Sequence, residues 1–221
     1  MDGTLKIKVR TLFGLAFDIE KDAGRKSGFK PASIDLGIGK ELFGDVRLDG
    51  FAAALTTGFA DELVLAGGDE GRYKGETQVI NRAWAIREML IHDCGIDAER
   101  IKSFASKSNT LGNVGIIRDF IAMNGRSLDE CGLMTNLYHL PRAHMDIVAH
   151  DVPLRLFAAE ALYLIEQPDR KNDLVARLGE GPMAERMVEE IAGIADKIRG
   201  SYQSRTDAAP VTIPGTVRAK A

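Results

Sequence analysis

The sequence predicts a single-domain α/β protein in which helices cover both faces of a mainly parallel sheet. Short β-like runs alternate with longer amphipathic stretches from residue 33 onward, and polar segments follow the runs. Strands that alternate with helices of this length need crossover connections, which favour parallel pairing. With 221 residues, 45% of them hydrophobic and 28% charged, the chain is long enough to bury a sizeable core.

Each predicted element follows from a local pattern. The predicted strands are residues 33–36, 62–66, 100–105, 132–135 and 152–157. Between them, apolar residues recur at helical spacing and form faces that include Leu48, Phe51 and Leu55, then Val79, Ala83 and Leu90, then Val114, Ile117 and Phe120. Gly95 predicts the end of the second helix, and Pro141 lies in the first turn of a helix that runs to about residue 149.

Both ends of the chain are predicted to lie outside this α/β domain, which is assigned to residues 33–165. In residues 1–32, the apolar side chains of Leu12, Phe13, Leu15 and Phe17 predict a helix packed on the domain. Asp18 and Glu20 cut this apolar run too short for a membrane span or a secretory signal. Residues 166–203 are assigned to C-terminal helices, and residues 204–221 to a mobile tail. The apolar stripe of the second C-terminal helix favours core cover over an oligomer contact; it comprises Met183, Met187, Val188, Ile191, Ile194 and Ile198.

Charge and composition exclude several function classes. Lysine and arginine total 29 against 32 acidic residues, a net charge of −3 that argues against a broad nucleic-acid binder. Cys94 and Cys131 are too few for a disulfide scaffold and fit a reducing cytoplasm. The four histidines lack metal-binding spacing, so no metal site is expected, and residues 37–39 lack the third glycine of a dinucleotide fingerprint.

The polar segments gather at the strand ends. Residues 37–40, 67–71, 107–110 and 135–139 each follow a predicted strand, and in a parallel sheet all four lie at the carboxyl edge. Glycines there allow close approach of a ligand, and helix N-termini supply free N–H groups. The expected ligand is a small molecule with an anionic or strongly accepting group.

Two of these segments add directed side chains. Asn109 and Asn113 share one helix face, as do His139 and Arg142. Arginine carries a planar, permanently charged fork suited to phosphate or carboxylate, and histidine can transfer a proton. A structural alternative stands beside each: Ser108 or Asn109 as a helix cap, His139 as a core histidine, Arg142 as a solvated residue, Glu76 as a first-turn acid, and Gly67-Gly68 as a plain strand end.

Taken together, these motifs resemble the YdcF/SanA/ElyC family of bacterial proteins over about residues 33–157. The resemblance is carried by Arg47-Leu48, by Gly67-Gly68 with Glu76 downstream, by Ser108-Asn109-Thr110-Leu111-Gly112-Asn113, and by Thr135-Asn136-Leu137-Tyr138-His139-Leu140-Pro141-Arg142-Ala143. Asn136 stands where the family usually has serine, and Gly112 where an acidic residue is common. This chain is more similar to the cytosolic YdcF-type members than to the membrane-anchored ones.

The resemblance implies a Rossmann-like three-layer α/β sandwich and S-adenosylmethionine as a ligand, without defining a reaction. The leading hypothesis is a YdcF-like binding protein or enzyme for a nucleotide-like or phosphorylated ligand with an anionic or ribose-like group. The alternatives are a non-catalytic ligand-sensing regulator or scaffold, and a phosphoryl- or glycosyl-processing hydrolase. A homo-oligomer is left open, and neither nucleic acid nor a membrane is expected as a partner.

Each candidate residue is assigned a role. His139 and Glu76 are the candidates for proton transfer. The candidates for ligand binding are Gly67, Gly68, Ser108, Asn109, Thr110, Asn113, Thr135, Asn136, Tyr138 and Arg142.

Overall fold

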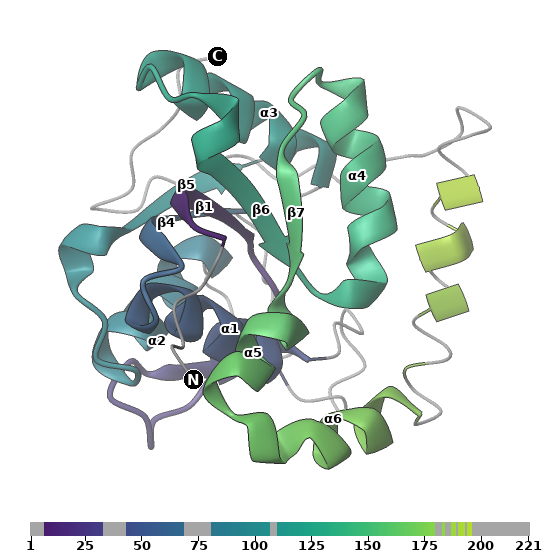
Figure 1. Cartoon of the computed structure of the whole chain (residues 1–221). Coiled ribbons are helices and arrows are strands. Elements are labelled where there is room, and N and C mark those ends of the chain that lie inside the picture. Colours follow the sequence, from purple (N-terminus) through teal and green to yellow (C-terminus); the bar gives the residue numbers. More distant parts are fainter. Residues whose placement is uncertain are drawn as a thin grey trace.

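A five-stranded sheet lies at the centre of the computed structural model, and helices cover both of its faces (Figure 1). The structure describes residues 7–32, 43–68, 81–106 and 110–179, and residues 183, 187, 188, 190–192, 194 and 195 near the C-terminus. The strands of the sheet are β1 (Val9–Leu15), β4 (Ala60–Gly68), β5 (Ile101–Ser106), β6 (Cys131–Thr135) and β7 (Arg155–Ala158). A separate antiparallel pair is formed by β2 (Ile19–Lys21) and β3 (Phe29–Pro31).

The strand order is β5-β4-β1-β6-β7, and every pairing in the sheet is parallel. The chain therefore moves outward from β1 through β4 to β5, and then returns to the other side of β1 to add β6 and β7. This is the order of a Rossmann-like fold. Its topological switch point lies between the carboxyl ends of β1 and β6, where open α/β sheets bind their ligands.

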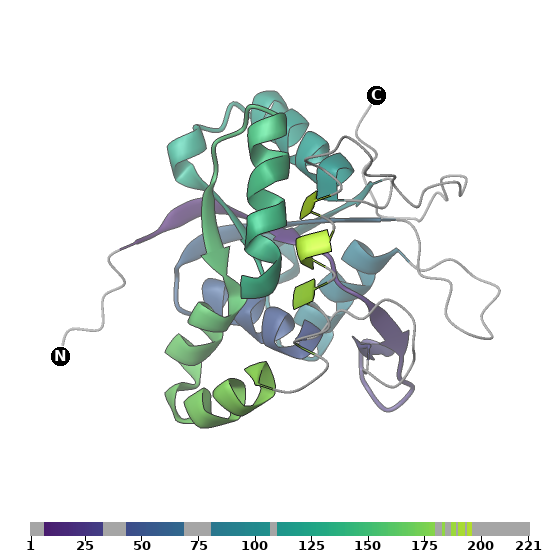
Figure 2. The same ribbon diagram turned by 90° about the vertical axis from the view of Figure 1, so that its right-hand side faces the viewer.

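The helices form the outer layers of a three-layer sandwich (Figure 2). On one face, α1 (Gly44–Thr56), α2 (Arg82–His92) and α5 (Ala159–Glu166) cover strand residues such as Leu63 and Leu65. On the other, α3 (Thr110–Met123) and α4 (Leu140–Ala149) cover Val64 and Ala66. The remaining helices are α6 (Lys171–Leu178) and the short 3-10 helices η2 (Ala98–Arg100), η3 (Leu128–Glu130), η4 (Leu137–His139) and η5 (Pro168–Arg170).

The helix boundaries predicted at Gly95 and Pro141 are confirmed by the local geometry. At the start of α2, which the sequence analysis did not locate, the side chain of Asn81 caps the helix by accepting a hydrogen bond from the amide of Trp84 at 2.8 Å. Gly95 ends the same helix with a φ of 72°, and the amide of Ile96 donates to the carbonyl of Leu90 at 3.0 Å. Pro141 lies in the first turn of α4, where its missing N–H costs no hydrogen bond.

The N-terminal prediction was wrong, because residues 9–15 form the central strand β1 and not a helix. Leu12 and Phe13 are fully buried between β4 and β6. A strand covered on both faces reads as a continuous apolar run, and such a run cannot be separated from a buried helix by its periodicity. The α/β domain therefore begins at β1, ahead of residue 33. The strand predicted at residues 33–36 lies outside the described residues.

The other four predicted strands are present as β4, β5, β6 and β7, and helical stripes such as Val114, Ile117 and Phe120 are buried as expected. The prediction of core cover by the last apolar stripe was wrong for three of its residues. Met183 is buried, but Met187, Val188 and Ile191 are 45%, 65% and 61% exposed. Residues 204–221 lie outside the described part of the chain.

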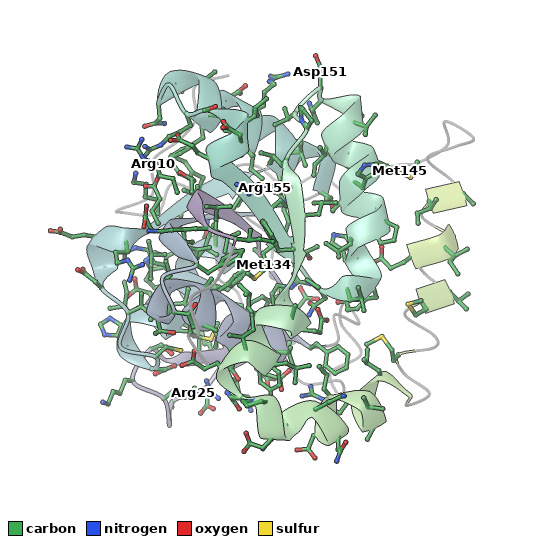
Figure 3. The ribbon with its side chains drawn as sticks, viewed as in Figure 1. Arg10, Arg25, Met134, Met145, Asp151 and Arg155 are labelled. Carbon is green, nitrogen blue, oxygen red and sulfur yellow. The ribbon has the colours of Figure 1, made fainter. Side chains whose placement is uncertain are left out.

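Figure 3 places Met134 of β6 in the interior of the molecule, whereas Arg25 and Asp151 lie at opposite ends. Within the described ranges, the helices are too short or too polar to cross a bilayer.

Candidate functional site

Three of the predicted residues meet at the carboxyl edge of the sheet. Thr110 is the first residue of α3, His139 ends η4, and Arg142 lies in the first turn of α4. The hydroxyl oxygen Oγ1 of Thr110 is 3.3 Å from Nε2 of His139. The guanidinium nitrogen Nη2 of Arg142 is 3.1 Å from Nδ1 of the same imidazole. Chain segments on either side of β6 are thus brought together as the sequence predicts.

A fourth member of this group, Glu190, was missed by the sequence analysis. Its carboxylate oxygen Oε2 is 2.9 Å from Nε of Arg142 and 3.2 Å from Nδ1 of His139, and the residue is 2% exposed. Glu190 belongs to a C-terminal helical segment, defined here by the helical residues 187, 188, 190–192, 194 and 195. We call Thr110, His139, Arg142 and Glu190 the His139 cluster.

Burial controls the charge of His139. Desolvation lowers its pKa below the usual value of about 6.5, and the positive charges of Arg142 and Arg47 lower it further, while Glu190 opposes them. The imidazole is therefore neutral at pH 7, with one nitrogen that donates and one that accepts. If Nδ1 donates to Glu190, Nε2 accepts from the Thr110 hydroxyl; if Nδ1 accepts from Arg142, Nε2 donates to Thr110. In both tautomers His139 joins the hydroxyl to the charged pair.

The lowered pKa of His139 predicts a loss of stability in mild acid. Below about pH 6.5 the unfolded chain protonates this imidazole before the folded protein does, so the free energy of unfolding falls as the pH drops through that window. In urea denaturation from pH 7.5 to 5.5, we expect His139→Gln to show a weaker pH dependence than the wild type. His144→Gln, at an exposed position on α4, serves as the control. Equal slopes for wild type and His139→Gln would contradict this interpretation.

Arg47 of α1 lies at the switch point, between the carboxyl ends of β1 and β6. Its Nε donates to Oδ1 of Asn136 at 2.6 Å, and its Nη1 lies 3.2 Å from the carbonyl oxygens of both Leu15 and Ala16. Arg47 is 1% exposed, so its guanidinium lies in the interior and links the chain after β1 to the chain after β6. The Arg-Leu that the resemblance singled out thus contributes an arginine that holds the fold at the ligand-binding position of open α/β sheets.

Asn136 connects this arginine to a buried acid. Its Nδ2 donates to Oε1 of Glu160 at 3.0 Å and to the carbonyl of Phe43 at 3.4 Å, while Oε2 of Glu160 accepts from the amide of Leu137 at 2.9 Å. Both amide protons and the carbonyl oxygen of Asn136 are therefore engaged within the protein. This geometry gives Asn136 a structural role.

Gly67 and Tyr138 also have packing roles. A Cβ atom on Gly67 would lie 2.2 Å from the Cβ of Ala16, so the close approach of two backbones explains this glycine without a ligand. Tyr138 packs in an apolar cluster with Phe43, Tyr163 and other residues near α6. Gly68 pairs with Ser106 at the end of β4 and β5.

Two further predicted residues lie close in the fold to the cluster. Asn113 is buried one turn after Thr110 on α3. Thr135 is fully buried at the carboxyl end of β6, and its hydroxyl makes no hydrogen bond within the described part of the chain. Because side chains alternate along a strand, Thr135 faces the α3 and α4 layer together with Leu133. Glu76, Ser108 and Asn109 lie outside the described residues.

Outside the His139 cluster, the described ranges hold a surface hollow and two cysteine thiols. No group of three or more His, Cys, Asp or Glu side chains within them could hold a metal ion. A surface hollow of about 390 Å³, lined by residues 24–26, His92 and Asp93, lies at the C-terminal end of α2. Burial raises the pKa of the Cys94 and Cys131 thiols to about 11, so neither is a ready nucleophile.

Comparisons with known proteins add no identity. No family model and no curated protein matches the chain. A crystal structure of a hypothetical protein from Xanthomonas campestris is 14% identical to it, and the match covers 78% of this chain and 90% of that one. The TM-score of 0.32 is too low for this likeness to carry any conclusion.

Proposed function

We propose that this chain binds a small nucleotide-like or phosphorylated molecule at the carboxyl edge of its sheet, through the His139 cluster. The observation that carries the proposal is the largely buried juxtaposition of a guanidinium, an imidazole and a hydroxyl beside the switch point. Burying a permanent positive charge is costly unless an anion compensates it; in this structure Glu190 compensates Arg142, and an anionic group of a ligand would do the same. A guanidinium placed at a ligand-binding edge is therefore suited to a phosphate or carboxylate group.

The cluster residues supply distinct groups to such a ligand. Arg142 carries the positive charge, and Thr110 adds a hydroxyl at the start of α3, where backbone N–H groups also favour anions. His139 is neutral and accepts or donates a proton, which makes it the candidate for any catalytic step. The hydroxyl of Thr135, which has no hydrogen-bond partner among the described residues, is a further hydrogen-bonding group on the same face of the sheet.

A YdcF-like identity, with S-adenosylmethionine as one ligand and a cytoplasmic location, belongs to this proposal. It is supported by the convergence of Thr110, His139 and Arg142, which come from the two most specific motifs of the resemblance. The methionyl carboxylate of S-adenosylmethionine carries the same type of anionic oxygen as a phosphate does. Both Cys94 and Cys131 are free thiols, which fits a reducing compartment.

A second candidate, a ligand-sensing regulator or scaffold, is favoured by the exposed apolar residues Met187, Val188 and Ile191. A contiguous patch of exposed apolar side chains often marks a surface that contacts another molecule. Light scattering of the full chain over a range of concentrations separates the two readings, since self-association that depends on added ligand supports the regulator.

Substitution of Arg142 by glutamine tests the proposed site. In a thermal-shift screen with inorganic phosphate, AMP and S-adenosylmethionine, a ligand at 100 times its Kd stabilises the wild type by about 2.7 kcal/mol. We expect Arg142→Gln to weaken binding of the anionic ligand by about 1.5–3 kcal/mol, since a charge-assisted hydrogen bond is lost. Arg118→Gln, at an exposed arginine of α3, is the matched control. Calorimetric affinity that is the same in Arg142→Gln and the control would remove Arg142 from the site.

A further inference from the structure

The carboxylate of Glu190 lies where the proposed function would place the anionic group of the ligand. We propose that Glu190 is an internal competitor of that ligand, and that the C-terminal helical segment covers the site until an anion displaces it. This inference rests on the proposed function and adds a regulatory device to the same site.

The first support is the set of atoms that Glu190 engages. Its Oε2 contacts Nε of Arg142 at 2.9 Å and Nδ1 of His139 at 3.2 Å, which are the charged and the proton-transferring groups of the cluster. Glu190 is 2% exposed, so little water screens its charge. A phosphate or carboxylate brought to Arg142 would meet this like charge at contact distance, and two anions there oppose each other. Binding of the ligand therefore requires Glu190 to move away from Arg142.

The second support is the orientation of the helical segment. A helix kept for packing buries its apolar stripe and exposes its acids. Here Glu190 points into the domain, whereas Met187, Val188 and Ile191 are 45%, 65% and 61% exposed. Ile194 is half-buried, so among the described residues of this segment the fully buried contact is the polar one that Glu190 makes. Such a contact can be exchanged for an equivalent contact with a ligand.

The third support is location. The segment lies beside α4 in both views of the fold (Figures 1 and 2). In Figure 3, Met145 points from α4 toward the side on which this segment lies. Glu190 therefore reaches the cluster from outside the sheet and its helices, from a part of the chain that follows α6. Its withdrawal would leave the paired strands and the helices of the sandwich intact.

Calorimetric titration of the full chain with inorganic phosphate and with AMP tests the competition. We expect Glu190→Gln to bind these probes roughly tenfold more tightly than the wild type, because the fraction of molecules with an open site rises. Glu166→Gln removes the same charge from an exposed position at the end of α5 and is expected to leave the affinity unchanged. Arg142→Gln, added to Glu190→Gln, should cancel the gain.

Hydrogen exchange of the wild type tests the same competition and does not depend on the folding of any variant. Adding AMP should increase exchange over residues 187–195, since displaced Glu190 no longer holds the segment. If wild type binds AMP through Arg142, but Glu190→Gln gains no affinity and exchange does not increase, the competition is overturned and the binding site stands. If neither the wild type nor Glu190→Gln binds phosphate or AMP, the proposed function falls and this inference falls with it.

Discussion

Replacing Arg47 with methionine is expected to lower the free energy of unfolding by about 3–5 kcal/mol, the usual cost of removing one partner from a buried charged network. Methionine keeps much of the aliphatic volume but leaves the carbonyls of Leu15 and Ala16 and the Oδ1 of Asn136 without their donor. Asn136 is hydrogen-bonded to both Arg47 and the buried carboxylate of Glu160, so the substitution also removes the positive charge at the other end of this chain of hydrogen bonds. Chemical denaturation measured by circular dichroism reports this loss.

An arginine on the surface provides the comparison. Arg118→Met removes a side chain that is 53% exposed and paired with the neighbouring Asp119. Exposed pairs contribute about 0–1 kcal/mol, so the change in stability should be small. A loss for Arg47→Met no larger than that for Arg118→Met would show that the switch point is held together by other contacts.

Substitution of Gly67 by alanine is expected to destabilise the protein by about 1–3 kcal/mol through overpacking. The new Cβ would lie 2.2 Å from the Cβ of Ala16, a distance that cannot be relieved by turning a flexible side chain. The end of β4 and the chain after β1 must therefore move apart at the carboxyl edge. Thermal unfolding of the purified variant measures the cost.

The same contact predicts a rescue. Ala16→Gly in the Gly67→Ala background removes the opposing Cβ and should restore most of the lost stability. Gly115→Ala is a control within α3, since the nearest atom to its new Cβ is 3.5 Å away on His150. Alanine there should stabilise the helix by up to about 1 kcal/mol. If the double variant remains as unstable as Gly67→Ala, the glycine is required for a reason other than its contact with Ala16.

Much of the sheet could be predicted from the sequence because its signals are local. The apolar run at residues 62–66 is followed by Gly67 and Gly68. The run at residues 132–134 is followed by Thr135 and Asn136, with Pro141 a few residues later. The helical stripes of α1, α2 and α3 repeat at the period of a helix, which requires no knowledge of tertiary contacts. Parallel pairing then follows from the alternation of the two kinds of element.

The central strand could not be assigned in the same way. Residues 9–15 owe their extended form to pairing with β4 and β6, and the second of these begins at Cys131. Burial of both faces removes the alternation that would mark a strand. Local pattern therefore leaves helix and strand equally compatible with Leu12 and Phe13, and partners distant in the chain decide between them.

The candidate site was predictable to the extent that it depends on strand ends. Thr110, His139 and Arg142 follow strands, so a parallel sheet brings them to one edge. Glu190 follows no strand, and none of the motifs in the sequence includes it. Its inward orientation depends on contacts with Arg142 and the neutral His139, which belong to another part of the fold, and a helical repeat carries no sign of them.

The position of β1 has a consequence for synthesis on the ribosome. The strand is made before its neighbour β6 (Cys131–Thr135), and β4, α2, β5 and α3 lie between them in the chain. Until β6 is made, one side of an apolar strand has open amide and carbonyl groups, a template for pairing with other nascent chains. Molecular chaperones that recognise extended apolar segments are therefore expected to hold this protein until β6 has been made.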